Sequence, residues 1–212
     1  MSFSDFKRLG DATKKFHLRT QDRLDFFGVC PHVAPSQLLI DTLERGAPLA
    51  AAIGTEKARS EMIVTPILLD LKTQAREISL FSGTDLNVDA ALGLTGTCDF
   101  LLSRGAEQFM LTAPVVALVE AKRDNILEGL GQCVAEMVAA QLFNQREEND
   151  VAAIYGAVTT GTAWTFLCLA GQMVTLDLRE YTLSQPEKLL GILLAMVTGT
   201  APVGAAGVAL PR

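Results

Sequence analysis

Two acidic residues and a lysine stand in or beside hydrophobic runs, where charged side chains are unusual. Asp99 interrupts the apolar segment "TCDFLLS", and Glu120 and Lys122 follow the run from Val115 to Val119. If that run is a β-strand, Glu120 and Lys122 share one face, because side chains alternate along a strand. A strand that ends in solvent would explain these two charges. It would not explain Asp99, because a carboxylate inside an apolar strand needs a partner.

A divalent cation is one partner that suits such a set. Two carboxylates brought together repel each other, and Mg²⁺ relieves the repulsion by taking oxygen ligands. A metal held by Asp99 and Glu120 could accept a phosphate oxygen. Lys122 beside it could orient or deprotonate a water molecule, or neutralise charge on phosphorus. The residue types therefore predict metal-assisted hydrolysis, provided that the three side chains converge.

The elements that would position these residues follow from the hydrophobic periodicity. Helical spacing predicts a helix over residues 55–75, with a kink or break at Pro66, and another over residues 126–147. Three strands are predicted between them at "EISLFSG", "GTCDFLLS" and "APVVALVEAK". Further strands are predicted at "DVAAIYGAVTTG", "TAWTFLCLAG" and "MVTLDLREY", and a last helix at "SQPEKLLGILLAM". This order predicts the α/β class, with a mixed β-sheet flanked by helices.

The same reading divides the chain into three parts. Residues 1–54 are expected to form an N-terminal helical extension, and residues 55–198 the α/β domain, which closes with a hairpin and a helix. Residues 199–212 are expected to be a flexible tail. A chain of 212 residues, 49% of them hydrophobic, has room for one such domain with a sizeable core.

Composition excludes several classes of protein. No segment has the roughly eighteen apolar residues of a membrane span, and the N-terminus lacks a secretory signal pattern, so no membrane partner is expected. Four dispersed cysteines indicate reduced, buried thiols and a cytoplasmic protein, and two histidines exclude a multi-histidine metal site. The net charge of −6 argues against tight nonspecific DNA binding. Residues 1–23, with six basic and three acidic side chains, form either a phosphate-contacting arm or a solvated helix.

The acid–lysine pattern resembles the signature of the PD-(D/E)XK nuclease superfamily, the fold of many restriction endonucleases. Asp99, twenty intervening residues and then Glu120-Ala121-Lys122 match its D…(D/E)xK motif, although Cys98 replaces the motif's proline. The resemblance implies that Asp99 and Glu120 ligate Mg²⁺ or Mn²⁺, assisted by the backbone carbonyl of Ala121. It also implies that Lys122 acts on the nucleophilic water.

Two helix residues extend the resemblance, which covers roughly residues 55–160 and implies a restriction-endonuclease-like αβββαβ core. Glu61 matches a glutamate that the superfamily often carries on the helix before the sheet, and would hold a second metal or a metal-bound water. Gln132 matches a glutamine on the helix after the motif strand, and would orient ligands or contact the scissile strand. Glu136, on the same helical face as Gln132, is expected to be solvated.

The function predicted from these residues is metal-dependent hydrolysis of DNA phosphodiester bonds. One alternative is a noncatalytic module of the same fold that binds a protein or nucleic-acid partner, and a homodimer is also compatible with the sequence. A further alternative is an enzyme that uses the same carboxylates on a small molecule. Two other motifs are rejected: "GLGQC" is not a nucleotide-binding loop, and "DLNVDAALG" lacks the glycine and glutamate of a calcium-binding loop.

Overall fold

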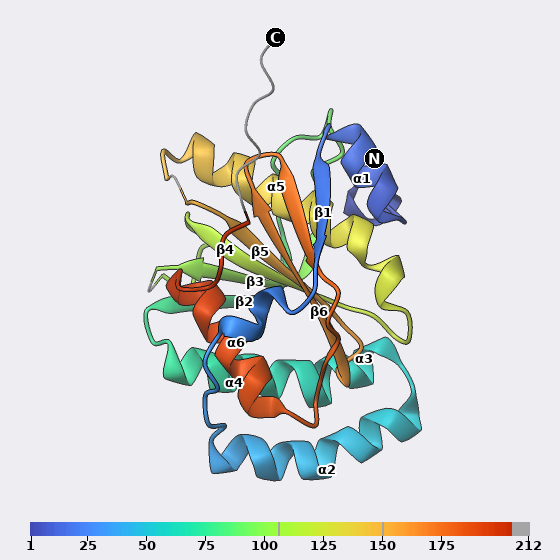
Figure 1. The fold of residues 1–212 in the computed structure, drawn as a ribbon, viewed down its shortest axis with the longest axis vertical. Helices are drawn as coiled ribbons and strands as arrows, with labels where there is room; N and C mark the ends of the chain where they lie inside the picture. The colour runs from blue at the N-terminus through green and yellow to red at the C-terminus, as the bar shows by residue number, and fades with distance from the viewer. Residues whose placement is uncertain (106, 150, 205–212) are drawn as a thin grey trace.

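The computed structural model describes residues 1–105, 107–149 and 151–204. Within them, the protein is an α/β fold whose mixed sheet of eight strands is flanked by helices (Figure 1). The helical elements are η1 (Phe3–Asp5), α1 (Leu9–Lys15), η2 (Phe26–Val29), α2 (Gln37–Ile53), α3 (Glu56–Arg59), η3 (Ser60–Val64), α4 (Thr65–Gln74), η4 (Ile126–Glu128), α5 (Leu130–Arg146) and α6 (Pro186–Thr198). The strands are β1 (Arg19–Arg23), β2 (Ile78–Asp85), β3 (Thr97–Arg104), β4 (Val115–Ala121), β5 (Ile154–Thr159), β6 (Ala163–Ala170), β7 (Met173–Asp177) and β8 (Tyr181–Thr182).

The strands run in the order β1-β7-β6-β5-β4-β3-β2, and β8 pairs with β6 outside this path. Strands β2, β3 and β4 form an antiparallel meander, as the three consecutive strand patterns predict. Helix α5 then crosses over and returns the chain to β5, which is parallel to β4. The β6–β7 hairpin follows through Gly171, whose positive φ of 57° suits glycine at this turn. The predicted mixed sheet flanked by helices is therefore confirmed.

Strand β4 lies in the middle of the sheet, and all its residues are buried. One face of the sheet packs against α5 and α1, and the other against α4 and α6 with α2 outside them (Figure 1). A strand covered on both faces needs apolar residues on both, which explains the nearly uninterrupted run before Glu120. Tyr155 and Trp164 lie in the core, and all four cysteines are buried, as their dispersed positions indicate.

Residues 1–54 do more than extend the domain with helices. They contribute β1, which pairs in parallel with β7 at the edge of the sheet, with Gln21 opposite Thr175. Its sequence "RTQDR" carries no apolar alternation, because an edge strand facing solvent on both sides can form from backbone hydrogen bonds alone. Phe3 and Phe6 are buried beside α5. Of the predicted tail, residues 205–212 lie outside the described residues.

The helix predicted over residues 55–75 is divided in three. Helix α3 passes into η3, a π-helical turn that carries Glu61, and α4 begins just before Pro66. Proline lacks an N–H and its ring clashes with the carbonyl four residues earlier, so the wider turn occurs where regular α-helix is not possible. Among the described residues, no helix is both long enough and apolar enough to cross a bilayer.

Candidate active site

Strands β3 and β4 place Asp99 beside Glu120. Their antiparallel register runs up to the pair Phe100 and Val119, and Asp99 and Glu120 are the next residues along the two strands. Oδ2 of Asp99 accepts a hydrogen bond of 2.8 Å from the backbone N–H of Ala121, which ties its side chain to the end of β4. The Asp99 carboxylate therefore lies beside the backbone of Ala121, and its charge reaches the neighbouring Glu120.

Lys122 completes the group. Its Nζ donates to Oε1 of Glu120, and its backbone N–H donates to the carbonyl of Thr159 at 2.7 Å. The Glu120 side chain is only 1% exposed and that of Lys122 is 18% exposed, so the ion pair is largely shielded from solvent. The two charges at the end of the β4 segment therefore compensate each other.

Burial shifts the protonation equilibria of all three groups. It raises the pKa of Glu120 to about 7; the Asp99 charge adds to this rise, and Lys122 partly offsets it. Burial also raises the pKa of Asp99, against the hydrogen bond from Ala121 and the charge of Lys122. For Lys122, burial lowers the pKa, but the neighbouring acids outweigh it and the net shift is upward. The lysine therefore stays charged, while the two acids gain stability from any additional cation.

Glu61 lies at the same site but is held less firmly. It lines a cavity of about 290 Å³ together with Asp99, Ala121 and Glu56. Its side chain is 57% exposed and pairs with Lys57 at 2.9 Å. Glu56 is a residue that the sequence analysis missed. Its charge reaches Glu120 and Lys122, and its position in the first turn of α3 is a common one for an acid, so nothing in the sequence distinguished it.

Gln132 and Glu136 lie one helical turn apart on α5, and Nε2 of Gln132 donates to Oε1 of Glu136 at 3.0 Å. The expectation that Glu136 is solvated is wrong: it is completely buried, because α5 covers the sheet and is itself covered by the N-terminal segment. Burial raises its pKa well above the usual range, and the Glu120 charge raises it further. A sequence signal existed, since Glu136 interrupts the apolar run "CVAEMVAA" as Asp99 interrupts its strand.

The carboxylates retain capacity for a cation. Oε2 of Glu120 and Oε2 of Glu136 are buried and have no hydrogen-bond partner within the described residues. Asp99 uses Oδ2 to accept from the Ala121 N–H. The part of the chain that the structure describes contains no cluster of three or more His, Cys, Asp or Glu side chains arranged as metal ligands. Mg²⁺ commonly binds through one or two carboxylates and keeps several waters, so Asp99 and Glu120 suit it.

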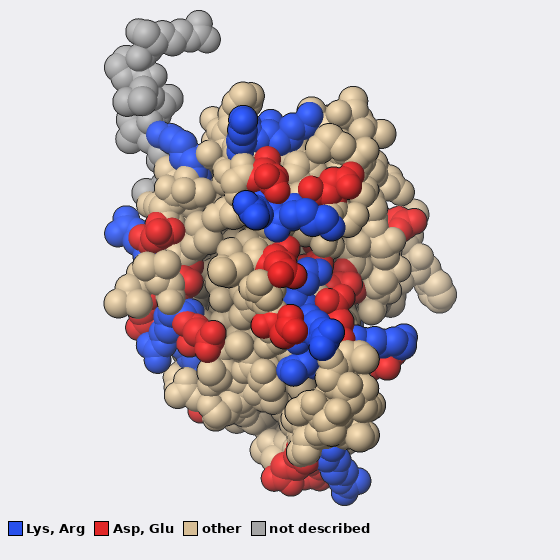
Figure 2. Space-filling model, turned by 90° about the vertical axis from the view of Figure 1, so that its right-hand side faces the viewer, with Lys and Arg blue, Asp and Glu red and all other residues tan. Residues whose placement is uncertain are grey.

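Charged side chains of both signs lie on the face of the molecule that Figure 2 shows. Lys, Arg, Asp and Glu side chains are intermingled down the middle of this face, and further charged groups lie at its left edge and lower end (Figure 2). The face corresponds to the right-hand side of Figure 1, where α1, α3 and the first turns of α5 lie. These are the elements that surround the end of β4, so the candidate site opens onto a mixed-charge surface.

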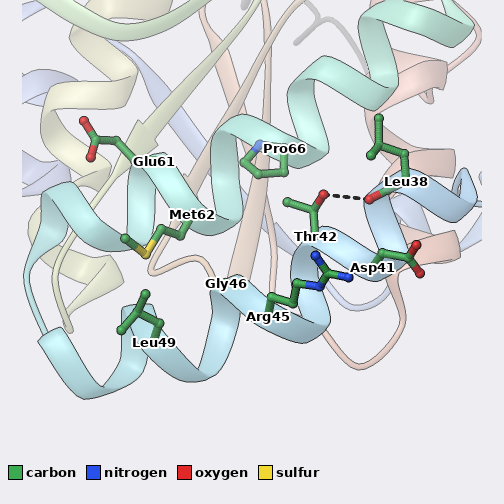
Figure 3. Close-up of a pocket in the computed structure, with 9 residues that line it drawn as sticks. All are labelled: Leu38, Asp41, Thr42, Arg45, Gly46, Leu49, Glu61, Met62 and Pro66. Carbon is green, nitrogen blue, oxygen red and sulfur yellow. Dashed lines mark hydrogen bonds between the residues drawn. The ribbon is translucent and has the colours of Figure 1, made fainter.

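A separate cavity of about 480 Å³ lies between α2 and the η3–α4 segment (Figure 3). Its lining is largely apolar and includes Leu38, Leu49 and Met62. Glu61 stands at its rim, and the carboxylate extends away from the other lining residues (Figure 3). We therefore do not count this cavity as part of the candidate site. The rejected calcium-loop acids are also engaged elsewhere, since Asp85 accepts from Thr97 at 2.6 Å.

Comparisons of the chain with protein-family models, with curated proteins and with solved structures found no match. The fold and the site therefore define the protein's class by themselves. It is an α/β protein with a mixed sheet, in which two acids and a lysine meet at the end of a buried central strand.

Proposed function

We propose that this protein is a metal-dependent nuclease that hydrolyses DNA phosphodiester bonds, with a restriction-endonuclease-like core of the PD-(D/E)XK type. The observation that supports it best is the meeting of Asp99, Glu120 and Lys122 at the ends of β3 and β4. The order α4, β2, β3, β4, α5, β5 is consistent with the αβββαβ core that the sequence resemblance implies.

Asp99 and Glu120 would hold Mg²⁺ or Mn²⁺, assisted by the carbonyl of Ala121. When bound, such an ion polarises a phosphoryl oxygen and lowers the pKa of a bound water. Metal binding requires deprotonated carboxylates, so Glu120 has to give up its proton as the site loads. The Ala121 N–H fixes the side chain of Asp99, which lowers the entropy lost in forming the site.

Lys122 serves as a charged group in this proposal. Its raised pKa keeps the ammonium protonated, which favours orienting the attacking water and stabilising negative charge on phosphorus over removing a proton. Gln132 lies one turn of α5 from the buried Glu136 and is held by it, so it can present its amide to the substrate strand. Glu61 and Glu56 line the cavity beside Asp99 and could hold metal-bound water.

Supercoiled plasmid incubated with the protein and Mg²⁺ or Mn²⁺ tests the proposal. We expect nicked and linear products with the wild type, and at least a hundredfold slower cleavage with Asp99→Ala or Lys122→Ala. Asp124→Ala is the matched control, because Asp124 is an exposed acid two residues beyond the motif. Cleavage that persists undiminished in the Asp99 and Lys122 variants, or in excess EDTA, would refute the assignment.

One observation favours a second candidate, a noncatalytic module of the same fold. The Lys122 ammonium already occupies Oε1 of Glu120, and the Ala121 N–H occupies Oδ2 of Asp99, so the acids have partners without a metal. Calorimetric titration of the wild type with Mn²⁺ separates the two candidates. Absence of binding at millimolar metal would favour the binding module over the nuclease.

A further inference from the structure

We propose that the cavity between the N-terminal segment and the start of α5 is a subsite for the phosphates of a nucleic-acid strand, adjacent to the candidate active site. The proposal rests on the proposed function for the neighbouring acids. The cavity measures about 890 Å³, and its polar lining includes Lys7, Arg8, Lys122, Asn125 and Gln132.

The cavity meets the candidate active site at Lys122. Ala121 lines the acidic cavity with Asp99, and Lys122 lines the larger one. Successive residues at the end of β4 point to opposite faces of the sheet, so the two cavities flank one strand end. A strand whose scissile phosphate lies at the acids can therefore place a neighbouring phosphate against the larger cavity by passing over Lys122.

The two cavities carry opposite charge. The acidic cavity has Glu56, Glu61 and Asp99 against Lys57. The larger cavity is lined by Lys7 and Arg8, and by Lys122, whose ammonium pairs with Glu120. Its lining acid is Glu128, whose carboxylate accepts from Asn125 at 3.0 Å. Cations suit the first cavity and phosphates the second. Helix α5 begins beside it at Leu130 without a side-chain cap, which adds the positive end of a helix dipole.

Lys7 and Arg8 are available to a ligand. Both residues are exposed, and in the described residues neither side chain takes part in an ion pair. In an acidic protein, unpaired cations next to a candidate hydrolytic site are the groups that a phosphodiester would contact.

The segment that carries these cations is fixed in place. Phe3 and Phe6 are buried beside α5, and the Phe3 N–H donates to the carbonyl of Thr95 at 2.9 Å. At Gly131, a Cβ would lie 2.4 Å from the Arg8 carbonyl oxygen and 2.5 Å from that of Phe6, so only glycine permits this approach. The cations are therefore held over the cavity before a ligand arrives, which reduces the entropy lost on binding.

Fluorescence anisotropy with labelled 20-nucleotide single-stranded and duplex DNA, in EDTA and over a range of salt concentrations, tests the subsite. We expect Lys7→Ala/Arg8→Ala to weaken binding at least tenfold and to reduce the slope of log K against log salt by roughly 1.4 to 1.8, as for two lost phosphate contacts. The charge-preserving Lys7→Arg/Arg8→Lys should retain most of the affinity.

Lys14→Ala/Lys15→Ala is the matched control, because this variant removes the same charge from the same segment. These two exposed lysines line a different cavity. If both double variants lose the same DNA affinity, the effect is one of net charge and the proposal is overturned. Absence of DNA binding by the wild type would also overturn it. DNA binding is measured without metal, so the two proposals can fail separately. If the protein does not cleave DNA with Mg²⁺ but Lys7→Ala/Arg8→Ala still weakens binding, only the proposed hydrolysis is refuted.

Discussion

Lys122 and Glu120 form an ion pair in which the glutamate side chain is buried and the lysine side chain is partly exposed. The exposed fractions of the two side chains are 1% and 18%. Their pairing explains how β4 can end on two charges while remaining buried along its whole length. The second carboxylate oxygen of Glu120 has no partner within the described residues, so the pair leaves the acid incompletely stabilised.

The stability of the protein should fall as the pH rises from about 4.5 to about 7. The pKa of Glu120 rises from 4.5 to about 7 on folding, so the folded state binds its proton more tightly than the unfolded state does. Between these values the folded state carries more protons, and the free energy of unfolding decreases with pH. The loss attributable to Glu120 is on the order of 3 kcal/mol.

Urea unfolding at pH 5, 6, 7 and 8 measures this dependence. Glu120→Gln should flatten the curve, whereas Glu128→Gln, an exposed acid, should leave it unchanged. Glu136, whose pKa is raised in the same direction, should contribute a further decrease. The raised pKa of Lys122 concerns only alkaline pH, where its stabilising charge is lost. A wild type whose stability increases from pH 5 to 8 would contradict the buried, protonated acid.

Removing the ammonium should cost more than removing the whole pair. Lys122→Met leaves the buried Glu120 carboxylate without its partner, and we expect a loss of about 2 to 4 kcal/mol at pH 8. In Lys122→Met/Glu120→Gln no charge is left uncompensated, so most of this stability should return. A double-mutant cycle by urea denaturation gives the coupling energy, and strictly additive losses would show that the two side chains do not interact.

Divalent metal should stabilise the folded protein through Asp99 and Glu120. If the acids form a site, Mn²⁺ at a hundred times its Kd adds about 2.7 kcal/mol to the free energy of unfolding. The apparent affinity should be higher at pH 8 than at pH 6, because Glu120 with a pKa of about 7 must lose its proton. Thermal melts with and without Mn²⁺ measure both effects. Asp99→Asn should abolish the stabilisation, and Asp124→Asn should retain it; equal behaviour of the two variants would place the metal elsewhere.

Gly131→Ala should loosen the N-terminal segment from α5. The added Cβ would lie within 2.5 Å of two backbone carbonyl oxygens, which cannot move without displacing the segment, so we expect a loss of about 1 to 3 kcal/mol. Gly10→Ala, where nothing lies within 4 Å of the new carbon, should be neutral or slightly stabilising, since alanine favours helix. Thermal unfolding and proteolytic release of the N-terminal residues monitor the effect. Equal stability of Gly131→Ala and wild type would show that the contact is not tight in solution.

Local pattern alone was sufficient for the central part of the fold. Apolar residues alternate with polar ones along half-buried strands and recur with the helical period along helices. This periodicity located β2 to β7 and α5. The same logic identified Asp99, Glu120 and Lys122, because a charge inside an apolar run requires compensation. Strands β2, β3 and β4 follow one another in the chain and pair as sequence neighbours, which is the commonest arrangement of consecutive strands.

Other features depended on packing between segments that are distant in the sequence. Strand β1 forms by pairing with the edge of β7, which lies more than 150 residues later in the sequence. The residues of β1 themselves do not alternate between apolar and polar. Glu136 is buried because α5 packs against β4 and β5, and Gly131 allows the N-terminal segment to approach α5 closely. The sequence by itself determined which residues are chemically unusual and which elements carry them. Only the tertiary structure decided which of their faces are covered, since solvent exposure is a property of the assembled surfaces.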